Sequence, residues 1–145
     1  LKRLWDGRDC LFVEGCFTRM GIGNDLFDNC RSIKRILGPA TNSFDSYDEI
    51  MNEVLKQPKD QLVLIAMGPT ATALAYDLYK EGYWAVDIGR VDLIYEKFIA
   101  NLPDLYSVRI PYKHCNVDES GAGGRVIEDV DDEKYKSQII ARVGD

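Results

Sequence analysis

The sequence has little histidine, few cysteines and no long apolar run. His114 is the only histidine, and Cys10, Cys16, Cys30 and Cys115 form no C-x-x-C motif. A zinc site therefore has few ligands to draw on, although the adjacent His114 and Cys115 could in principle ligate a metal. No apolar run approaches the roughly 20 residues of a membrane-spanning helix, and the polar opening residues predict no secretory signal. We expect reduced thiols and a cytoplasmic location.

Positive charge is also scarce. Lysine and arginine number 18 against 24 aspartate and glutamate residues, which gives a net charge of −6 and a pI of about 4.8. Proteins that bind DNA or RNA usually carry a basic stripe, and the nearest cluster here, residues 31–35, is interrupted by Ser32 and Ile33. We therefore expect no nucleic-acid partner. Because the chain begins at Leu1 rather than Met, we expect it to be one domain of a longer protein.

What the sequence does contain is an alternation of apolar runs and helical patterns. The apolar runs, typical of buried strands, cover residues 10–15, 33–37, 62–66 and 84–89. The helical patterns cover residues 24–30, 44–55, 71–80 and 91–98. Their apolar residues, including Phe44, Leu55, Ile94 and Phe98, are expected to face the sheet. This alternation predicts an α/β fold, a Rossmann-like parallel sheet of about four to five strands flanked by helices.

The alternation ends after Pro103. Pro111 lies within residues 106–112 and limits that run to an edge strand. Residues 119–124 are rich in glycine and predict a loop, and residues 131–142 predict a short terminal helix with Tyr135, Ile139 and Ile140 packed inward. The acidic residues 131–133 are interpreted as the solvated start of that helix.

Ligands of an open parallel sheet bind beyond the carboxyl ends of its strands. The clearest candidate there is the segment MGPTAT, in which Pro69 suits the first position of a helix. The unpaired N–H groups of such a helix start attract phosphate, although Gly68 equally suits a plain tight turn, and both interpretations stay open. We expect Glu14, Thr70 and Asp87 to cluster at this edge.

Residues 14–25, EGCFTRMGIGND, are called the opening segment below. They resemble a dinucleotide fingerprint only superficially, because Leu26 occupies the third glycine position and no acidic residue ends the second strand. A Rossmann oxidoreductase is therefore disfavoured. We expect Gly21 and Gly23 to admit a diphosphate and Arg19 to neutralise it. A surface salt bridge is the alternative for Arg19, and helix capping is the alternative for the Asn-Asp pair that follows.

Three acidic residues lie in the segment DIGRVDLIYE. Asp87 ends a strand predicted to be buried, where a carboxylate is costly unless it binds something. We therefore expect Asp87 to act as a general base or as an acceptor for a ribose hydroxyl. Asp92 and Glu96 stand four residues apart and share a helix face near the same edge. A solvated helix charge is the alternative for Glu96.

At these segments the sequence resembles the catalytic region of the GT-D-type bacterial glycosyltransferases, first catalogued as a domain of unknown function. The family motifs V-E-G-x-x-[ST]-R-x-G-[VI]-G-N-D-L-F, L-G-P-T-A and D-I-G-H-x-D-x-E-Y-E-W-F have counterparts here, in order, across about residues 5–98. Two of the departures from the pattern concern charged or aromatic positions. Arg90 replaces the family's histidine and Lys97 replaces its tryptophan. A cation is kept at the first position, so a phosphate contact can persist there.

The resemblance implies transfer of a sugar from a nucleotide diphosphate donor, a UDP-sugar such as UDP-glucose. The acceptor would be a glycan or glycoprotein in bacterial surface polysaccharide or glycoprotein synthesis. The alternative is a non-catalytic nucleotide-binding Rossmann-like domain. The resemblance also implies a Mn²⁺ or Mg²⁺ ion whose ligands lie upstream of this chain, in an Arg-Phe-Gly-Asp-Gly-Glu-like motif, with no metal ligands in the chain itself.

The resemblance divides the chain into a nucleotide-sugar-binding half, residues 1–112, and a loop with a terminal helix packed on it, residues 113–145. Its implied site residues fall into two groups. The expected catalytic residues are Asp87, Asp92 and Glu96. The expected donor-binding and phosphate-binding residues are Glu14, Arg19, Gly21, Gly23, Asn24, Asp25, Gly68, Pro69, Thr70, Gly89 and Arg90.

Overall fold

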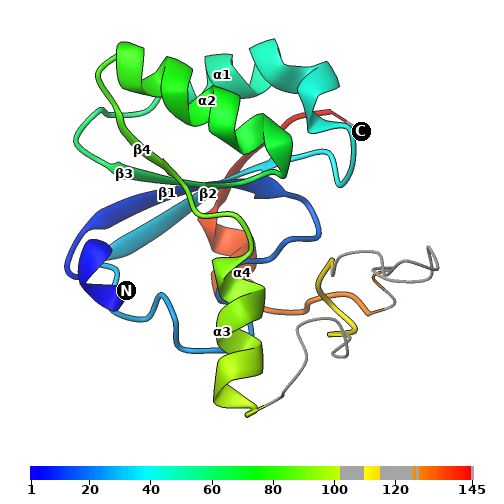
Figure 1. The fold of residues 1–145 in the computed structure, drawn as a ribbon. Helices are drawn as coiled ribbons and strands as arrows, with labels where there is room; N and C mark the ends of the chain where they lie inside the picture. Colours follow the sequence, from blue (N-terminus) through cyan, green and yellow to red (C-terminus); the bar gives the residue numbers. More distant parts are fainter. Residues whose placement is uncertain (102–109, 115–125, 127, 145) are drawn as a thin grey trace.

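A five-stranded parallel sheet forms the centre of the protein (Figure 1). This computed structural model describes residues 1–101, 110–114, 126 and 128–144. The spatial order of the strands is β4-β3-β1-β2-β5, and every neighbouring pair is parallel. The α/β parallel-sheet prediction is therefore confirmed. The strands are β1 (Asp9–Gly15), β2 (Ser32–Gly38), β3 (Leu62–Ala66), β4 (Trp84–Asp87) and β5 (Ile139–Arg142).

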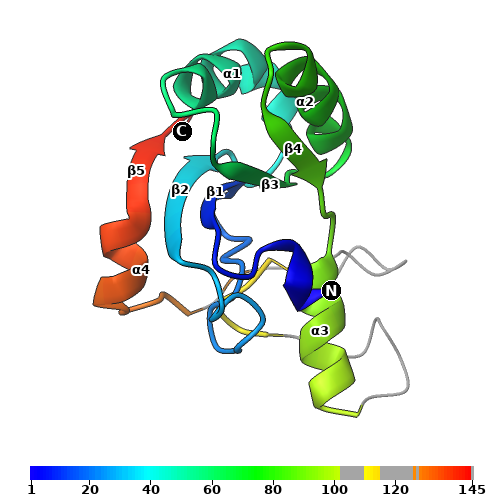
Figure 2. The same ribbon diagram turned by 90° about the vertical axis from the view of Figure 1, so that its left-hand side faces the viewer.

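Helices lie on both sides of the sheet (Figures 1 and 2). Helices α1 (Tyr47–Leu55) and α2 (Pro69–Lys80) cover one face, and α1 is preceded by the 3₁₀ helix η2 (Ser43–Ser46). On the other side lie α3 (Val91–Ile99), α4 (Glu133–Gln138) and the 3₁₀ helix η1 (Lys2–Leu4). None of the helices within the described ranges is long and apolar enough to cross a lipid bilayer.

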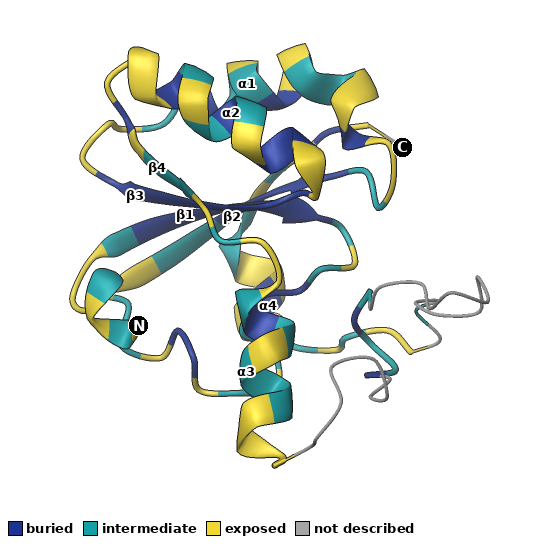
Figure 3. Ribbon diagram, viewed as in Figure 1, coloured by how far each residue is buried: buried dark blue, intermediate teal, exposed yellow. Residues whose placement is uncertain are grey.

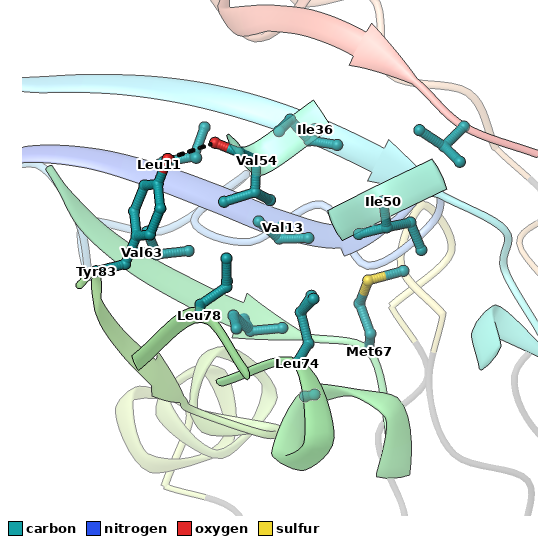
Figure 4. Packing of buried hydrophobic residues seen from close by; sticks show 13 residues of the cluster. Leu11, Val13, Ile36, Ile50, Val54, Val63, Met67, Leu74, Leu78 and Tyr83 are labelled. Carbon is teal, nitrogen blue, oxygen red and sulfur yellow. Dashed lines mark hydrogen bonds between the residues drawn. The ribbon is translucent and has the colours of Figure 1, made fainter. Parts of the chain in front are cut away.

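Alternate residues of the central strands supply two hydrophobic cores, one on each face of the sheet. Leu11 and Val13 of β1 pack under α1 and α2, where Tyr83 donates a hydrogen bond to the Val54 carbonyl (Figure 4). Cys10 and Phe12 belong to the opposite core. Because β3 lies between two other strands and is covered on both faces, all of its residues are buried, as its apolar run predicted.

Burial decreases toward β4, which is an edge strand (Figure 3). The run 84–89 was expected to be a buried strand, but β4 ends at Asp87 and both Trp84 and Asp87 are exposed. The reason is that β4 has a strand neighbour on one side only. The predicted desolvation of the Asp87 carboxylate is therefore wrong, although its position at the end of a strand is confirmed.

The helix predicted over residues 24–30 is replaced by a series of turns. Two side chains bind the backbone groups that a helix would need. The Trp5 indole donates to the Leu26 carbonyl at 3.0 Å, and the Asn24 side-chain oxygen accepts from the Leu26 amide at 3.0 Å. Leu26 and Phe27 still reach the core that the helix was expected to cover, so the apolar pattern identified the burial but not the conformation.

The terminal helix predicted over residues 131–142 is half helix and half strand. Asp132 caps the start of α4 by accepting from the Tyr135 amide at 3.0 Å, which confirms the interpretation of the acidic stretch. The chain then extends, and Ile139 pairs with Arg35 as β5 joins the open edge of β2. A helical pattern was overridden here by backbone pairing at a sheet edge, which the local sequence does not reveal.

Several smaller expectations also differ from the structure. Residues 43–46 form a 3₁₀ turn rather than the first turn of α1, and no side-chain hydrogen bond caps either start. Phe44, Leu55, Ile94 and Phe98 are exposed rather than packed on the sheet, and Ile140 is exposed rather than packed inward. Of the possible strand over residues 106–112, residues 111–112 form a turn and residues 106–109 lie outside the described residues, as does the predicted loop over 119–124.

A buried ion pair joins the two central strands on the side of α4. Glu14 of β1 is fully buried, and its Oε1 lies 2.5 Å from Nη1 of Arg35 on β2. The Arg35 guanidinium also donates to the Met20 carbonyl and to Gln138 of α4. Its Cζ atom lies 4.9 Å from the ring centres of Phe12 and Tyr135. Burial raises the pKa of Glu14, while Arg35 and the Met20 N–H act in the opposite direction.

Replacing Arg35 by methionine should be strongly destabilising, because it leaves the Glu14 carboxylate buried without a cation. We expect the free energy of unfolding to fall by about 3–5 kcal/mol, measured by urea denaturation. The matched control is Arg31→Met, which breaks an exposed pair between Asp9 of β1 and the residue that precedes β2 and should cost about 0–1 kcal/mol. Equal losses of unfolding free energy in the two variants would show that burial of the Glu14–Arg35 pair does not increase its contribution to stability.

Candidate functional site

A cleft of about 790 Å³ lies at the carboxyl edge of the sheet, and it is called the main cleft below. Loops that follow β1, β2, β3 and β4 all contribute to it, as the topology of a parallel sheet requires. Its volume lies in the range of small-molecule sites, roughly 300–1,000 Å³. The lining residues are Gly15, Thr18, Met20, Pro39, Ala40, Thr41, Asn42, Ser43, Phe44, Ala66, Met67, Gly68, Pro69, Thr70, Asp87, Gly89, Arg90, Asp92, Leu93 and His114.

The turn from β3 into α2 forms one wall of the main cleft. Gly68 has φ +55°, a conformation that favours glycine, and Pro69 occupies the first position of α2. The helix start has no side-chain cap. Pro69 has no N–H and the Ala71 N–H donates to the Gly68 carbonyl at 3.1 Å, so the Thr70 N–H is the donor that the first turn offers to a ligand. Thr70 is buried beside them. The structure therefore contains both the tight turn and the uncapped helix start that the sequence left as alternatives.

Asp87 and Arg90 lie on the β4 side of the same cleft. The Asp87 carboxylate accepts from the Thr72 hydroxyl at 2.8 Å and from the Gly89 amide at 3.0 Å, and these bonds fix its orientation. Asp87 stays exposed, and Arg90 directly precedes α3. Thr70 and Asp87 therefore share one cleft, as predicted, while Glu14, buried against Arg35, does not line it.

Asp92 and Glu96 are held by one buried lysine. The Lys113 ammonium lies 2.6 Å from Asp92 and 2.8 Å from Glu96, and its side chain is completely buried. Asp92 also accepts from the Gly21 amide and from the Asn24 side chain, both at 2.9 Å. Asn24 donates to Glu96 as well, at 2.8 Å. Glu96 is therefore not a solvated helix charge, and both carboxylates share one ammonium and are hydrogen-bonded by partners within the protein.

Arg19 was expected to be free to neutralise a diphosphate, or to form a surface salt bridge. It is buried, with φ +50°, and its guanidinium donates to the carbonyls of Tyr112 and Glu128 at 2.9 and 3.1 Å. It also pairs with Asp129 at 2.8 Å. The Val130 N–H and the Arg19 charge lower the pKa of Asp129. The expectation failed because these partners lie about 90–110 residues away in the sequence.

The glycines of the opening segment admit protein side chains. Gly21 and Gly23 have φ +77° and +82°. A Cβ atom on Gly23 would lie 2.1 Å from the Tyr112 hydroxyl, and one on Gly21 would lie 2.9 Å from the Phe27 ring. With Asn24, both glycines line a second cavity of about 520 Å³ near α4. The structure therefore separates these predicted phosphate-binding residues from Gly68, Pro69 and Thr70 in the main cleft.

Asp25 lies away from both cavities on an exposed surface. Its carboxylate pairs with the Lys2 ammonium at 2.7 Å and accepts from the Tyr95 hydroxyl at 2.6 Å. The hydrogen bond from Lys2, followed by that from Tyr95, lowers the pKa of Asp25. The predicted cap of a following helix is absent, because the residues that follow form turns.

Sequence reasoning missed the short turn over residues 110–114. Lys113 pairs with both α3 carboxylates, and His114, considered only as a metal ligand with Cys115, lines the main cleft. No local pattern signals a buried lysine whose partners lie 17 and 21 residues earlier. Cys115 lies outside the described residues. Among the described residues, no group of three or more His, Cys, Asp or Glu side chains could hold a metal ion.

Comparison with known proteins agrees with this architecture. The family model described as "Glycosyltransferase GT-D fold" matches residues 1–118. The chain is 42% identical to the probable glycosyl transferase Gly of Streptococcus gordonii, covering 99% of this chain and 20% of that protein. It is 40% identical to the glycosyltransferase GlyD of Streptococcus pneumoniae serotype 4, covering 99% of this chain and 17% of that protein.

Solved structures show the same similarity. A new glycosyltransferase (DUF1792) from Streptococcus sanguinis superposes with a TM-score of 0.88 at 42% identity, over 97% of this chain and 51% of that one. A domain of unknown function 1792, described as having a distinct glycosyltransferase fold, superposes with a TM-score of 0.87 at 41% identity, over 97% and 49%. The chain thus spans about half of each solved structure and about a fifth of each curated relative.

These matches define a glycosyltransferase-type α/β domain. The chain belongs to the glycosyltransferase GT-D fold family, as the resemblance of its sequence motifs predicted.

The Lys113 cluster gives a direct test of how the site is held together. Lys113→Met keeps the buried stem but leaves the Asp92 and Glu96 carboxylates without their cation. The free energy of unfolding should fall by about 3–5 kcal/mol, measured by urea denaturation. Lys56→Met is the control, since it breaks an exposed pair with Glu53 and should cost about 0–1 kcal/mol. A Lys113 variant as stable as the Lys56 variant would contradict the assigned role.

Proposed function

We propose that this chain is the nucleotide-binding part of a glycosyltransferase that moves a sugar from a UDP-sugar, such as UDP-glucose, to a glycan or glycoprotein. The observation that carries the proposal is the main cleft. It combines an uncapped helix start, an arginine and an oriented carboxylate at the carboxyl edge of a parallel sheet. Membership of the GT-D family and the names of the two streptococcal relatives support the same reaction class.

The donor diphosphate is proposed to lie against the start of α2. Backbone N–H groups and the positive end of the helix dipole favour an anion there. Gly68 leaves that approach open, because a Cβ atom added to it would contact nothing within 4 Å. Arg90 and Gly89 line the facing side of the cleft, and the Arg90 guanidinium matches a diphosphate in charge and geometry.

The transfer itself needs a place for one proton. The bond between the sugar C1 and the diphosphate oxygen breaks, the acceptor hydroxyl oxygen bonds to C1, and the hydroxyl proton passes to a base. Among the three predicted catalytic carboxylates, we propose Asp87 as that base. It lines the cleft and is exposed, whereas Asp92 and Glu96 are held by Lys113. Hydrogen bonds from Thr72 and Gly89 hold the Asp87 carboxylate in one orientation.

The described residues offer no ligand set for the Mn²⁺ or Mg²⁺ ion that the family resemblance implies. Asp87 is bound by Thr72 and Gly89, and Asp92 is neutralised by Lys113. Any such ion would take its main ligands from a segment upstream of this chain, and no step above passes through it. A role in bacterial surface polysaccharide or glycoprotein synthesis, in the cytoplasm, is part of the same proposal.

Asp87→Asn tests the proposed base, because it keeps the shape of the side chain and removes its charge. We expect sugar transfer from UDP-glucose by the full-length protein to fall by on the order of a hundredfold or more, with the unfolding temperature nearly unchanged. Transfer is measured as radiolabelled sugar incorporated into acceptor glycan. The control is Asp60→Asn, an equally exposed carboxylate before β3 at the opposite end of the sheet, which should leave transfer unchanged.

Two outcomes would contradict this assignment. Retained transfer with a lowered unfolding temperature would make Asp87 a structural residue and leave Asp92 and Glu96 as the remaining candidates. Binding of UDP without transfer in the full-length protein would favour the alternative, a non-catalytic nucleotide-binding domain. Thermal-shift measurements with UDP, UDP-glucose and NAD distinguish a glycosyltransferase or a nucleotide-binding domain from an oxidoreductase. Only an oxidoreductase would be stabilised most by NAD.

A further inference from the structure

The turn over residues 110–114 is held from several directions by the opening segment and α3. Arg19 donates to the Tyr112 carbonyl at 2.9 Å, and the ring of Tyr112 packs on the bare backbone of Gly23. Lys113 is buried between two carboxylates of α3. The His114 amide donates to the Phe17 carbonyl at 2.7 Å. Each of these contacts fixes one residue of a turn that belongs to no helix or strand.

Burying Lys113 and Arg19 requires desolvating two cations, and a buried ion pair seldom repays that cost in stability. Such an arrangement is better suited to fixing a position than to strengthening a fold. The residue whose position these contacts fix is His114, which directly follows Lys113 and lines the main cleft. In the part of the chain that the structure describes, the His114 ring has no hydrogen-bond partner. Within those described residues, the imidazole at the cleft is therefore left as a donor for a ligand.

We propose that His114 binds the diphosphate of the ligand in the main cleft by donating a hydrogen bond from its imidazole N–H. The inference rests on the proposed function, because it requires a phosphorylated ligand in that cleft. The turn over residues 110–114 then positions His114 at the wall of the main cleft while the anion is bound.

The charged residues of the cleft favour this role over others. Of its two carboxylates, Asp92 is neutralised by Lys113, and Asp87 is bound by Thr72 and Gly89. Among the described lining residues, this leaves Arg90 and His114 as the basic side chains that face an incoming ligand. Both are donors, and donors that line one cleft fit an anion such as a diphosphate.

The experiment measures the affinity of the full-length protein for UDP, inorganic pyrophosphate and uridine by calorimetry. We expect His114→Ala to lower the affinity for UDP and for pyrophosphate by about tenfold or more and to leave the affinity for uridine unchanged. His114→Gln, which keeps an N–H donor at similar reach, should lose less. Lys134→Ala removes an exposed cation at the second cavity and should leave all three affinities unchanged. Unfolding temperatures show whether each variant is folded. If His114→Ala does not fold, the affinities of His114→Gln are used to test the proposal.

The contrary results are distinct from one another. If His114→Ala binds UDP as tightly as the unmodified chain, the inference is wrong and the proposed function stands. If His114→Ala loses affinity for uridine and UDP equally, the imidazole ring contacts the nucleoside, and the proposed phosphate contact is wrong. If the unmodified chain binds neither UDP nor pyrophosphate, both the proposed donor and the role of His114 fail.

Discussion

The buried pair of Glu14 and Arg35 is the interaction on which the other features of the site depend. It joins the two central strands, and it also holds the loop between them. Glu14 accepts from the Met20 amide at 2.7 Å while Arg35 donates to the Met20 carbonyl at 2.9 Å. The peptide groups on both sides of Met20 are thereby fixed to the sheet. The neighbouring Gly21 amide is then placed to meet Asp92 of α3, which lies far along the chain.

From this anchor the opening segment reaches outward to the rest of the site. Its amides, its arginine and its asparagine are bound by protein partners, and its glycines give room to aromatic rings. The segment therefore positions α3 and the turn that carries His114. Open donors lie instead on the loops that follow β3 and β4, around Gly68 and Arg90. The opening segment thus supports the site from within the protein, while shorter loops face the ligand.

The sequence predicted what depends on local periodicity and on strand ends. Parallel strands, helices α1 to α3 and the shared edge of Thr70 and Asp87 all follow from such patterns. It failed where distant partners decide the conformation. The Trp5 indole prevents a helix at Leu26, β5 forms because an edge of β2 is open, and Lys113 neutralises Asp92 across 21 residues. None of these contacts leaves a periodic signal in the segments that they reshape.

The central claim is that ligand binds at the main cleft and that the opening segment supports it from within the protein. A titration of the ¹⁵N-labelled chain with UDP, followed by amide chemical shifts, tests this most directly. The account predicts the largest shifts at Gly68, Thr70 and Gly89, with little change at Gly21 and Gly23. Shifts concentrated at Gly21 and Gly23, with Gly68 and Thr70 unaffected, would contradict it and move the diphosphate to the opening segment.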